Sequence, residues 1–204
     1  PALLSDTGEF PEIADADAPR TERRLLFVGQ YVHGKRIAEF ADALARVHAA
    51  AGDAAPPVVL VLVGDGPLRG PLAAQAERIG RQPGLRMEVR EPVAPAAVPT
   101  LMAAHQVLVL PSAFETWGMV VNEAMAVGLP VLGSRQSQAV EALVRDGENG
   151  WVFDATDPAS LDAAIGAMLA ASAPRLERMG RAARAAAARL DESTVAAQWQ
   201  ALIE

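Results

Sequence analysis

Cysteine is absent from the 204-residue sequence, so disulfide bonds and thiolate metal sites are excluded. Lysine is almost absent as well: of the 18 basic residues, one is Lys35 and the other 17 are arginine. The three histidines are scattered along the chain and form no ligand motif. No apolar run reaches the roughly 18 residues that a membrane-spanning helix needs. We therefore expect no bound metal and no membrane span.

A positive charge balance is also lacking. The chain has 25 acidic and 18 basic residues, which gives a formal net charge of −7. A nucleic-acid-binding protein would show a basic surface, so we expect no nucleic-acid partner. A chain of this length forms one domain or at most two.

Short apolar runs divide the chain into repeating units. Residues 1–22 have no clear period and are rich in Asp, Glu and Pro, which predicts a linker or irregular arm before a domain over 23–204. Apolar runs that do not alternate with polar residues are typical of strands buried on both faces of a parallel sheet. We predict six such strands, at Leu25–Gly29, Val58–Val63, Leu85–Arg90, Val107–Leu110, Val131–Gly133 and Gly150–Phe153.

Helical patterns separate these runs. We predict helices at 35–51, 67–80, 95–104, 118–128, 138–145 and 157–171. Residues 174–204 predict a C-terminal extension of two helices, broken near 191–193. The fold class is therefore α/β, with a doubly wound parallel six-stranded sheet. If its strands follow the order 3-2-1-4-5-6, ligands bind after the first and fourth strands, where the winding reverses.

The loop after the first strand, Gly29 to Arg36, nearly matches the phosphate loop G-x-x-x-x-G-K-[ST]. Arg36 stands where the magnesium-binding hydroxyl belongs, which disfavours a P-loop-like nucleotidase but leaves it as an alternative. Lys35 is the sole lysine, and it follows a predicted strand. We interpret it as a functional residue that supplies a compact ammonium charge, rather than as an ordinary solvated lysine.

The loop after the fourth strand carries two carboxylates, Glu115 and Glu123, eight positions apart. Gly118 opens a helix between them, and its N–H group and those of Met119 and Val120 should lie unpaired at the helix start. Such a helix end binds phosphate, and glycine lets the backbone approach closely. Two carboxylates are compatible with a phosphate site if each accepts hydrogen bonds from hydroxyl groups, one on each side of a diphosphate that the backbone binds. A nucleotide-sugar has that arrangement.

These residues resemble the group 1, family 4 type glycosyltransferases, enzymes of the GT-B architecture with two Rossmann-like domains. The similarity covers about Leu25 to Glu204 and matches the nucleotide-sugar-binding C-terminal domain. Its motifs are FVG…K at 27–35, GDGPL at 64–68, LVLPS at 108–112, the Glu115 and Glu123 pair, EAMAVGLPV at 123–131 and E-x-L-V-R-D-G-E-N-G at 141–150.

The resemblance implies sugar transfer with retention of configuration and without a cofactor or bound metal. Lys35 would stabilise the departing diphosphate, and Glu115 would touch the donor sugar. In the first loop, the remaining donor-binding residues would be Gly29, Gln30 and Arg36. The backbone near Arg90 and Val93 would contact the nucleobase of the donor. The groups around the diphosphate and the ribose would be Gly118, Met119, Val120 and Glu123.

One departure bears on activity. Family members usually have arginine five positions before the lysine, where this chain has Gln30. A missing cation on the leaving group could cost about 3 kcal/mol. Arg36 could replace it, activity could be reduced, or the chain could be a non-catalytic nucleotide-sugar-binding module.

The resemblance also implies what surrounds this domain. An N-terminal acceptor domain would belong to the same full-length protein and is missing from this chain, so the isolated chain should be inactive. Its donor would be a UDP-, GDP- or other NDP-sugar. The resemblance implies a cytoplasmic enzyme, with peripheral contact at the inner face of the membrane open to the full-length form.

Overall fold

A computed structural model describes residues 22–189 as one sheet of six parallel strands between two layers of helices. The strand order is β3-β2-β1-β4-β5-β6, so the doubly wound, Rossmann-like fold and its predicted order are confirmed. The strands are β1 (Arg23–Val28), β2 (Val58–Val63), β3 (Leu85–Arg90), β4 (Val107–Leu110), β5 (Val131–Ser134) and β6 (Gly150–Phe153).

The first six helices occur where the sequence predicted them and are no longer than predicted, and the tail helix begins one residue before the predicted extension. They are α1 (Ile37–Ala51), α2 (Arg69–Ile79), α3 (Val98–Ala103), α4 (Met119–Ala126), α5 (Gln138–Leu143), α6 (Pro158–Leu169) and α7 (Ala173–Ala188), with 3-10 turns η1 (His33–Lys35), η2 (Gly52–Ala54) and η3 (Pro95–Ala97). Asp157 caps α6 by accepting a hydrogen bond from the Ala159 N–H at 2.9 Å. The predicted arm before residue 22 and second tail helix at 191–204 lie outside the described residues.

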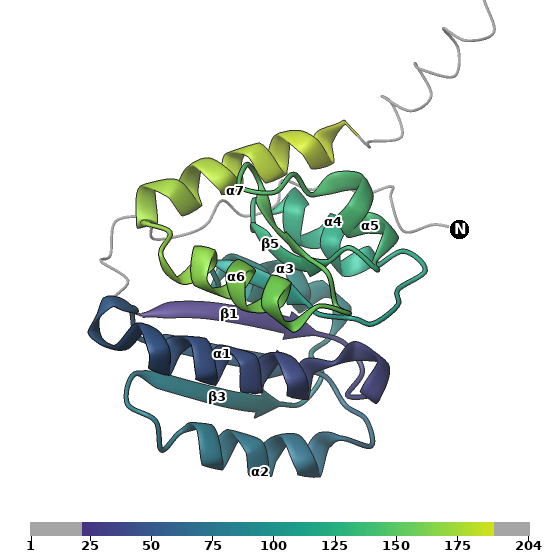
Figure 1. Cartoon of the computed structure of the whole chain (residues 1–204). Helices are drawn as coiled ribbons and strands as arrows, with labels where there is room; N and C mark the ends of the chain where they lie inside the picture. The colour runs from purple at the N-terminus through teal and green to yellow at the C-terminus, as the bar shows by residue number, and fades with distance from the viewer. Residues whose placement is uncertain (1–21, 190–204) are drawn as a thin grey trace, which may run out of the picture.

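A separate apolar core fills each side of the sheet. In Figure 1, α1, α2 and α6 cover the near face, and α3, α4 and α5 lie behind the sheet. On the near side Phe27 and Leu60 pack with Phe40 of α1 and Ile165 of α6. On the other side Val61 and Leu108 belong to the cluster that includes α4. All six residues of β2 are buried, as expected for a strand covered on both faces.

Strand β1 begins at Arg23, two residues before the predicted Leu25. Arginine is unusual in a buried strand, and Arg23 is only 8% exposed. Its guanidinium donates to the carbonyl oxygens of Met168 and, at 2.5 Å, Ala171, which lie at the C-terminal end of α6. Carbonyl oxygens at a helix C-terminus carry partial negative charge, which favours a cation there. Arg23 therefore joins the sheet to α6, and this contact requires long-range packing that the sequence pattern does not reveal.

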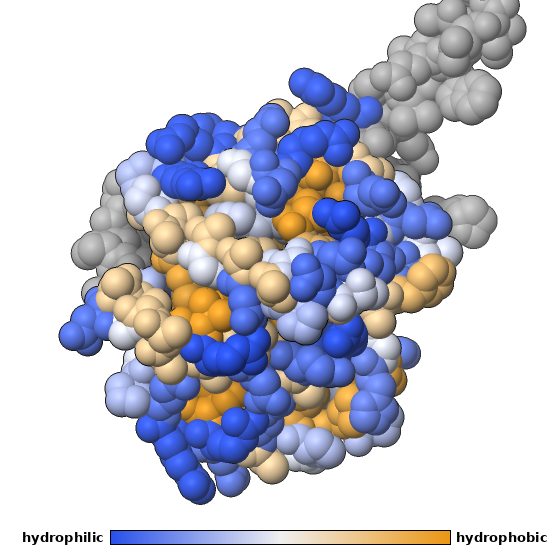
Figure 2. All heavy atoms as spheres, viewed as in Figure 1, coloured by the Kyte–Doolittle hydropathy of each residue, from blue (hydrophilic) through white to orange (hydrophobic). Residues whose placement is uncertain are grey.

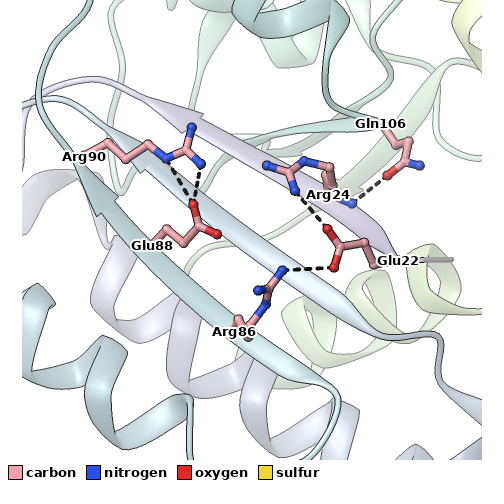
Figure 3. A network of polar contacts seen from close by, with 6 residues as sticks. All are labelled: Glu22, Arg24, Arg86, Glu88, Arg90 and Gln106. Atoms are coloured by element: carbon pink, nitrogen blue, oxygen red, sulfur yellow. Dashed lines mark hydrogen bonds and ion pairs between the residues drawn. The ribbon is translucent and has the colours of Figure 1, made fainter. Parts of the chain in front are cut away.

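Strand β3 differs from the prediction of a strand buried on both faces. It lies at the sheet edge, where Leu85, Met87 and Val89 join the near core. The alternate residues Arg86, Glu88 and Arg90 form surface ion pairs on the other face, together with Glu22 and Arg24 (Figure 3). The strand thus has the alternating pattern of a half-exposed strand, because no helix within residues 22–189 covers this face at the sheet edge (Figure 3).

The surface over the near face is mostly hydrophilic. Figure 2 shows small apolar areas there, separated by charged and polar side chains. Within residues 22–189, no helix is both long enough and apolar enough to cross a membrane.

Candidate functional site

The β1–α1 and β4–α4 loops lie next to each other because β1 and β4 are neighbours at the point where the winding reverses. A hydrogen bond from the Ala113 N–H to the Gly34 carbonyl, 2.9 Å long, joins the two loops. These are the loops that sequence reasoning selected. Residues about 80 positions apart along the chain therefore meet at the carboxyl edge of the sheet.

Lys35 and Glu115 form an ion pair across this junction. The Lys35 ammonium donates to Glu115 Oε2, and the hydroxyl of Ser112 lies 3.3 Å from the same oxygen as a second donor. The two charged side chains are 23% and 21% exposed, while Ser112 is fully buried. The carboxylate is thus held from the sheet side by a buried hydroxyl, and the ammonium remains accessible to solvent and to a ligand.

The β5–α5 loop holds Glu115 by its backbone. The Glu115 N–H donates to the Gln136 carbonyl at 3.1 Å, and the Gln138 N–H donates to the Glu115 carbonyl at 3.3 Å. Ser137 is fully buried, and its hydroxyl donates to the Trp117 carbonyl at 2.8 Å. Three loops therefore fix the position of the carboxylate.

Gly118 turns the chain into α4 with φ of 101°, in the left-handed region that favours glycine. A Cβ at this position would lie 2.9 Å from the Ser137 hydroxyl and 3.3 Å from Glu115 Cγ. Within residues 22–189, the N–H groups of Gly118, Met119 and Val120 have no hydrogen-bond acceptor, as the sequence predicted. The Val121 N–H, in contrast, donates to the Gly118 carbonyl. The three free donors lie at the positive end of the helix, beside Glu115.

Glu123 stands one turn further along α4 and is exposed at the surface. Partial burial of its carboxyl nevertheless raises its pKa above the ordinary value. The neighbouring protein therefore disfavours the charged form of this carboxyl group.

The first loop does not direct a second cation at Glu115. Gln30 is exposed, and its carbonyl accepts a hydrogen bond from the Val32 N–H. Arg36 has φ of 51°, and its guanidinium donates to the Ala155 carbonyl after β6 and lies 3.8 Å from Glu39. Arg36 thus fastens the β1–α1 loop to the β6–α6 loop. A role for Arg36 in place of the missing arginine requires it to leave these partners.

Tyr31 connects the GDGPL motif to the first loop, a role that sequence reasoning missed. Its side chain is fully buried, and its hydroxyl donates to the Arg90 carbonyl at 3.0 Å. Its backbone N–H donates to the Asp65 carbonyl at 2.8 Å, and its carbonyl accepts from the Leu68 N–H at 3.0 Å. The β2–α2 loop therefore packs directly on the loop that carries Lys35. The sequence offered one signal for this role: Tyr31 is the only tyrosine in the chain and lies between Gly29 and Gly34.

Burial raises the pKa of Tyr31 to about 12. The ordinary pKa of tyrosine, near 10, applies to the unfolded chain. The contribution of the buried phenol to stability is therefore complete below pH 10 and is lost as the pH rises through 12. In that range the unfolded chain has released the phenolic proton and the folded chain still holds it, so rising pH favours unfolding. The chain has one tyrosine, so phenolate absorbance reports this group alone. We expect an ultraviolet titration midpoint near pH 12 in the folded chain and near pH 10 in denaturant. A midpoint of 10 in both would contradict the burial.

Arg90 and Val93, predicted near the base, lie at the end of β3 and beyond it. The Arg90 carbonyl already accepts hydrogen bonds from the Tyr31 hydroxyl and the Gly64 N–H, and its guanidinium pairs with Glu88 (Figure 3). Val93 is 37% exposed. Glu91 forms an ion pair with Arg69 at 2.5 Å, which explains an acidic residue at this strand end.

Two serines of the candidate site were given no role from the sequence, although Ser112 ends the LVLPS motif. Ser112 and Ser137 are fully buried hydroxyls that hold Glu115 and the turn at Gly118. Serine is common in loops, so only their burial marks them. The described residues contain no group of three or more His, Asp or Glu side chains arranged to hold a metal ion.

Comparison with known proteins identifies the family. The model of the family "Glycosyl transferases group 1" matches residues 9–186. The phosphatidyl-myo-inositol mannosyltransferase of Mycobacterium leprae is 32% identical over 97% of this chain and 53% of its own length. The lipopolysaccharide core biosynthesis glycosyltransferase LpsE of Rhizobium meliloti is 31% identical over 74% of this chain and 41% of its own. The chain thus spans about half the length, or less, of these curated relatives.

Solved structures agree on the fold. HepE from Anabaena, solved in complex with UDP-glucose, aligns with a TM-score of 0.69 and 25% identity over 89% of this chain and 48% of that one. The sucrose-phosphate synthase of Thermosynechococcus elongatus aligns with a TM-score of 0.72 and 25% identity over 91% and 46%. The six-stranded Rossmann-like sheet, the motifs and the family match agree: this chain belongs to the group 1 glycosyltransferases, enzymes of the GT-B fold.

Proposed function

We propose that this chain is the donor-binding half of a retaining glycosyltransferase that transfers a hexose from a nucleotide-sugar. The observation that carries the proposal is the meeting of Lys35 and Glu115 beside the free N–H groups of Gly118, Met119 and Val120. An ammonium group and a helix N-terminus together provide an anion site suited to a diphosphate. The family match supports this interpretation over the P-loop-like nucleotidase.

Each side chain has a separate task in this proposal. Lys35 leaves Glu115 and binds the diphosphate, where it stabilises the negative charge that develops as the sugar departs. Glu115, still held by Ser112, then accepts hydrogen bonds from sugar hydroxyls. Gly29 and Gln30 lie beside the diphosphate, and backbone near Arg90 and Val93 contacts the base. No metal ion is part of the scheme, because the protein's own cation and amides supply the positive charge.

Calorimetry with UDP and GDP tests the proposal on this chain. We choose these two because the base is not determined by the residues, and HepE, a structural neighbour, has been solved with UDP-glucose. Saturable binding of either nucleotide, equal in magnesium and in EDTA, is the expected result. If neither nucleotide binds, ADP and dTDP are tested in the same way; absence of binding by all four would refute the donor-site assignment, and binding only with magnesium would favour the nucleotidase.

Glu123 is expected to hold the ribose. Replacing it with alanine should weaken nucleoside diphosphate binding about ten- to 100-fold, because a hydrogen bond from a hydroxyl to a charged acceptor contributes about 1.5–3 kcal/mol. The matched control is Glu141→Ala, since Glu141 is an exposed acid on the neighbouring α5. Calorimetry that gives the same affinity for Glu123→Ala and wild type would remove Glu123 from the site.

A substitution at Gln30 distinguishes an active enzyme from a non-catalytic binding module. In the full-length protein we expect Gln30→Arg to raise the transfer rate at least tenfold if the missing cation limits catalysis. No turnover by either form would support a non-catalytic module.

We propose that the acceptor domain lies elsewhere in the full-length protein, together with any contact with the cytoplasmic face of the membrane. A transfer rate measured with this chain alone would overturn that division.

A further inference from the structure

A side-chain hydrogen bond spans the turn into α4. The indole N–H of Trp117 donates to the side-chain oxygen of Asn122 at 2.8 Å. Trp117 precedes the N-cap Gly118, and Asn122 lies at the fourth position of the helix. These are the two positions at which an apolar pair often fixes the angle of entry into a helix. In this chain a directional hydrogen bond occupies that place.

Hydrogen bonds hold Trp117 from two directions, and the bond to Asn122 is the one on the side of α4. The Trp117 carbonyl accepts hydrogen bonds from the Ser137 hydroxyl at 2.8 Å and the Ala139 N–H at 2.9 Å, so its backbone is fixed to the β5–α5 side. Among the hydrogen bonds of residues 22–189, the bond to Asn122 is the one that joins the Trp117 side chain to α4. The indole is 36% exposed, so packing alone constrains it weakly.

We propose that Trp117 and Asn122 are positioning residues that hold the N–H groups of Gly118, Met119 and Val120 in the arrangement a diphosphate requires. This inference rests on the proposed donor site. Fixed donors bind an anion more tightly than donors that must first be ordered. Neither side chain needs to touch the ligand, because both act through the backbone between them.

Two substitutions remove the bond with little other change. Trp117→Phe keeps an aromatic ring and loses the donor, and Asn122→Ala loses the acceptor. The matched control is Glu141→Ala, because Glu141 carries an exposed polar side chain on the adjacent α5. The probes are UDP and GDP. The one that wild type binds more tightly is then compared with its own nucleoside, uridine or guanosine, by calorimetry and ligand-observed NMR.

We expect each substitution to raise the dissociation constant of the diphosphate three- to tenfold and to change that of the nucleoside less than twofold. The double variant should be no weaker than the weaker single variant, since one bond accounts for both losses. In the ligand-free chain, hydrogen exchange across 118–126 should be faster in both variants. Glu141→Ala should behave as wild type in every measurement.

Other results overturn the inference. Equal weakening of nucleoside and diphosphate would show a general structural effect, and unchanged or additive losses would show that the bond does not act on the amides. If wild type binds none of UDP, GDP, ADP and dTDP, the donor site itself is refuted and the inference falls with it. Exchange in the ligand-free variants shows separately whether the bond orders α4, so the two failures are distinguishable.

Discussion

Lys35→Ala is expected to weaken UDP binding by this chain about 100-fold, or about 2.7 kcal/mol. A lysine at about 4 Å from a phosphate contributes about 4 kcal/mol at the effective dielectric near a protein surface. The wild-type chain must first break the Lys35–Glu115 ion pair, which reduces the net gain. In the variant, Glu115 loses its cation and faces the diphosphate as a bare carboxylate. Calorimetry with UDP, or with GDP if that is the tighter ligand, measures the loss.

Glu115→Gln is the matched control for this prediction. It removes the same ion pair but leaves the ammonium free, so bare UDP should bind at least as tightly as to wild type. The same variant should weaken UDP-glucose relative to UDP, because Glu115 is assigned to the sugar. If Lys35→Ala and Glu115→Gln lower UDP affinity equally, the ion pair serves only to order the loops, and the assigned role of Lys35 is wrong.

Gly64→Ala is expected to lower the free energy of unfolding by about 3 kcal/mol, at the upper end of the usual cost of overpacking. A Cβ at Gly64 would overlap the Gly29 carbonyl oxygen, and the Gly64 N–H is tied to the Arg90 carbonyl. Both contacts are with backbone, which cannot turn aside as a side chain can. For a domain of this size the melting temperature should fall by about 10 °C.

The control is Gly166→Ala in α6, where a Cβ would meet no atom within 4 Å. Alanine inside a helix is favoured over glycine by about 0.5–1 kcal/mol, so this variant should be slightly more stable than wild type. Thermal and urea unfolding of the two variants measure the difference. A Gly64→Ala chain as stable as wild type would mean that the β1–α1 and β2–α2 loops separate freely, contrary to the close packing at Tyr31.

The pattern of the chain predicted the elements of the sheet well because burial on both faces leaves a local signature. The six-residue run of β2 is uniformly apolar and fully buried. Arg23 and β3 departed from that pattern. The Arg23 guanidinium is satisfied by the end of α6, far along the chain, and β3 lies at an edge where one face needs no apolar cover. Both outcomes depend on neighbours that short-range periodicity does not identify.

The candidate site was predicted in part for the same reason. Topology places the loops after the first and fourth strands together, so Lys35 and Glu115 were identified without coordinates. Their direct pairing and the buried hydroxyl of Ser112 were not, because hydrogen-bond partners follow from side-chain directions in three dimensions. The same holds for Arg36, whose guanidinium is engaged by the Ala155 carbonyl, more than 100 positions away along the chain.

The sequence by itself determined the doubly wound sheet, the loops at its reversal point and the kinds of charge that they carry. Period, glycine placement and the single lysine are local properties that the chain possesses before it folds. Tertiary structure alone decided that Lys35 is paired with Glu115, that Tyr31 fastens two loops together and that Trp117 bonds across the start of α4. Each of these depends on distances between atoms, which are set only when both layers of helices pack on the sheet.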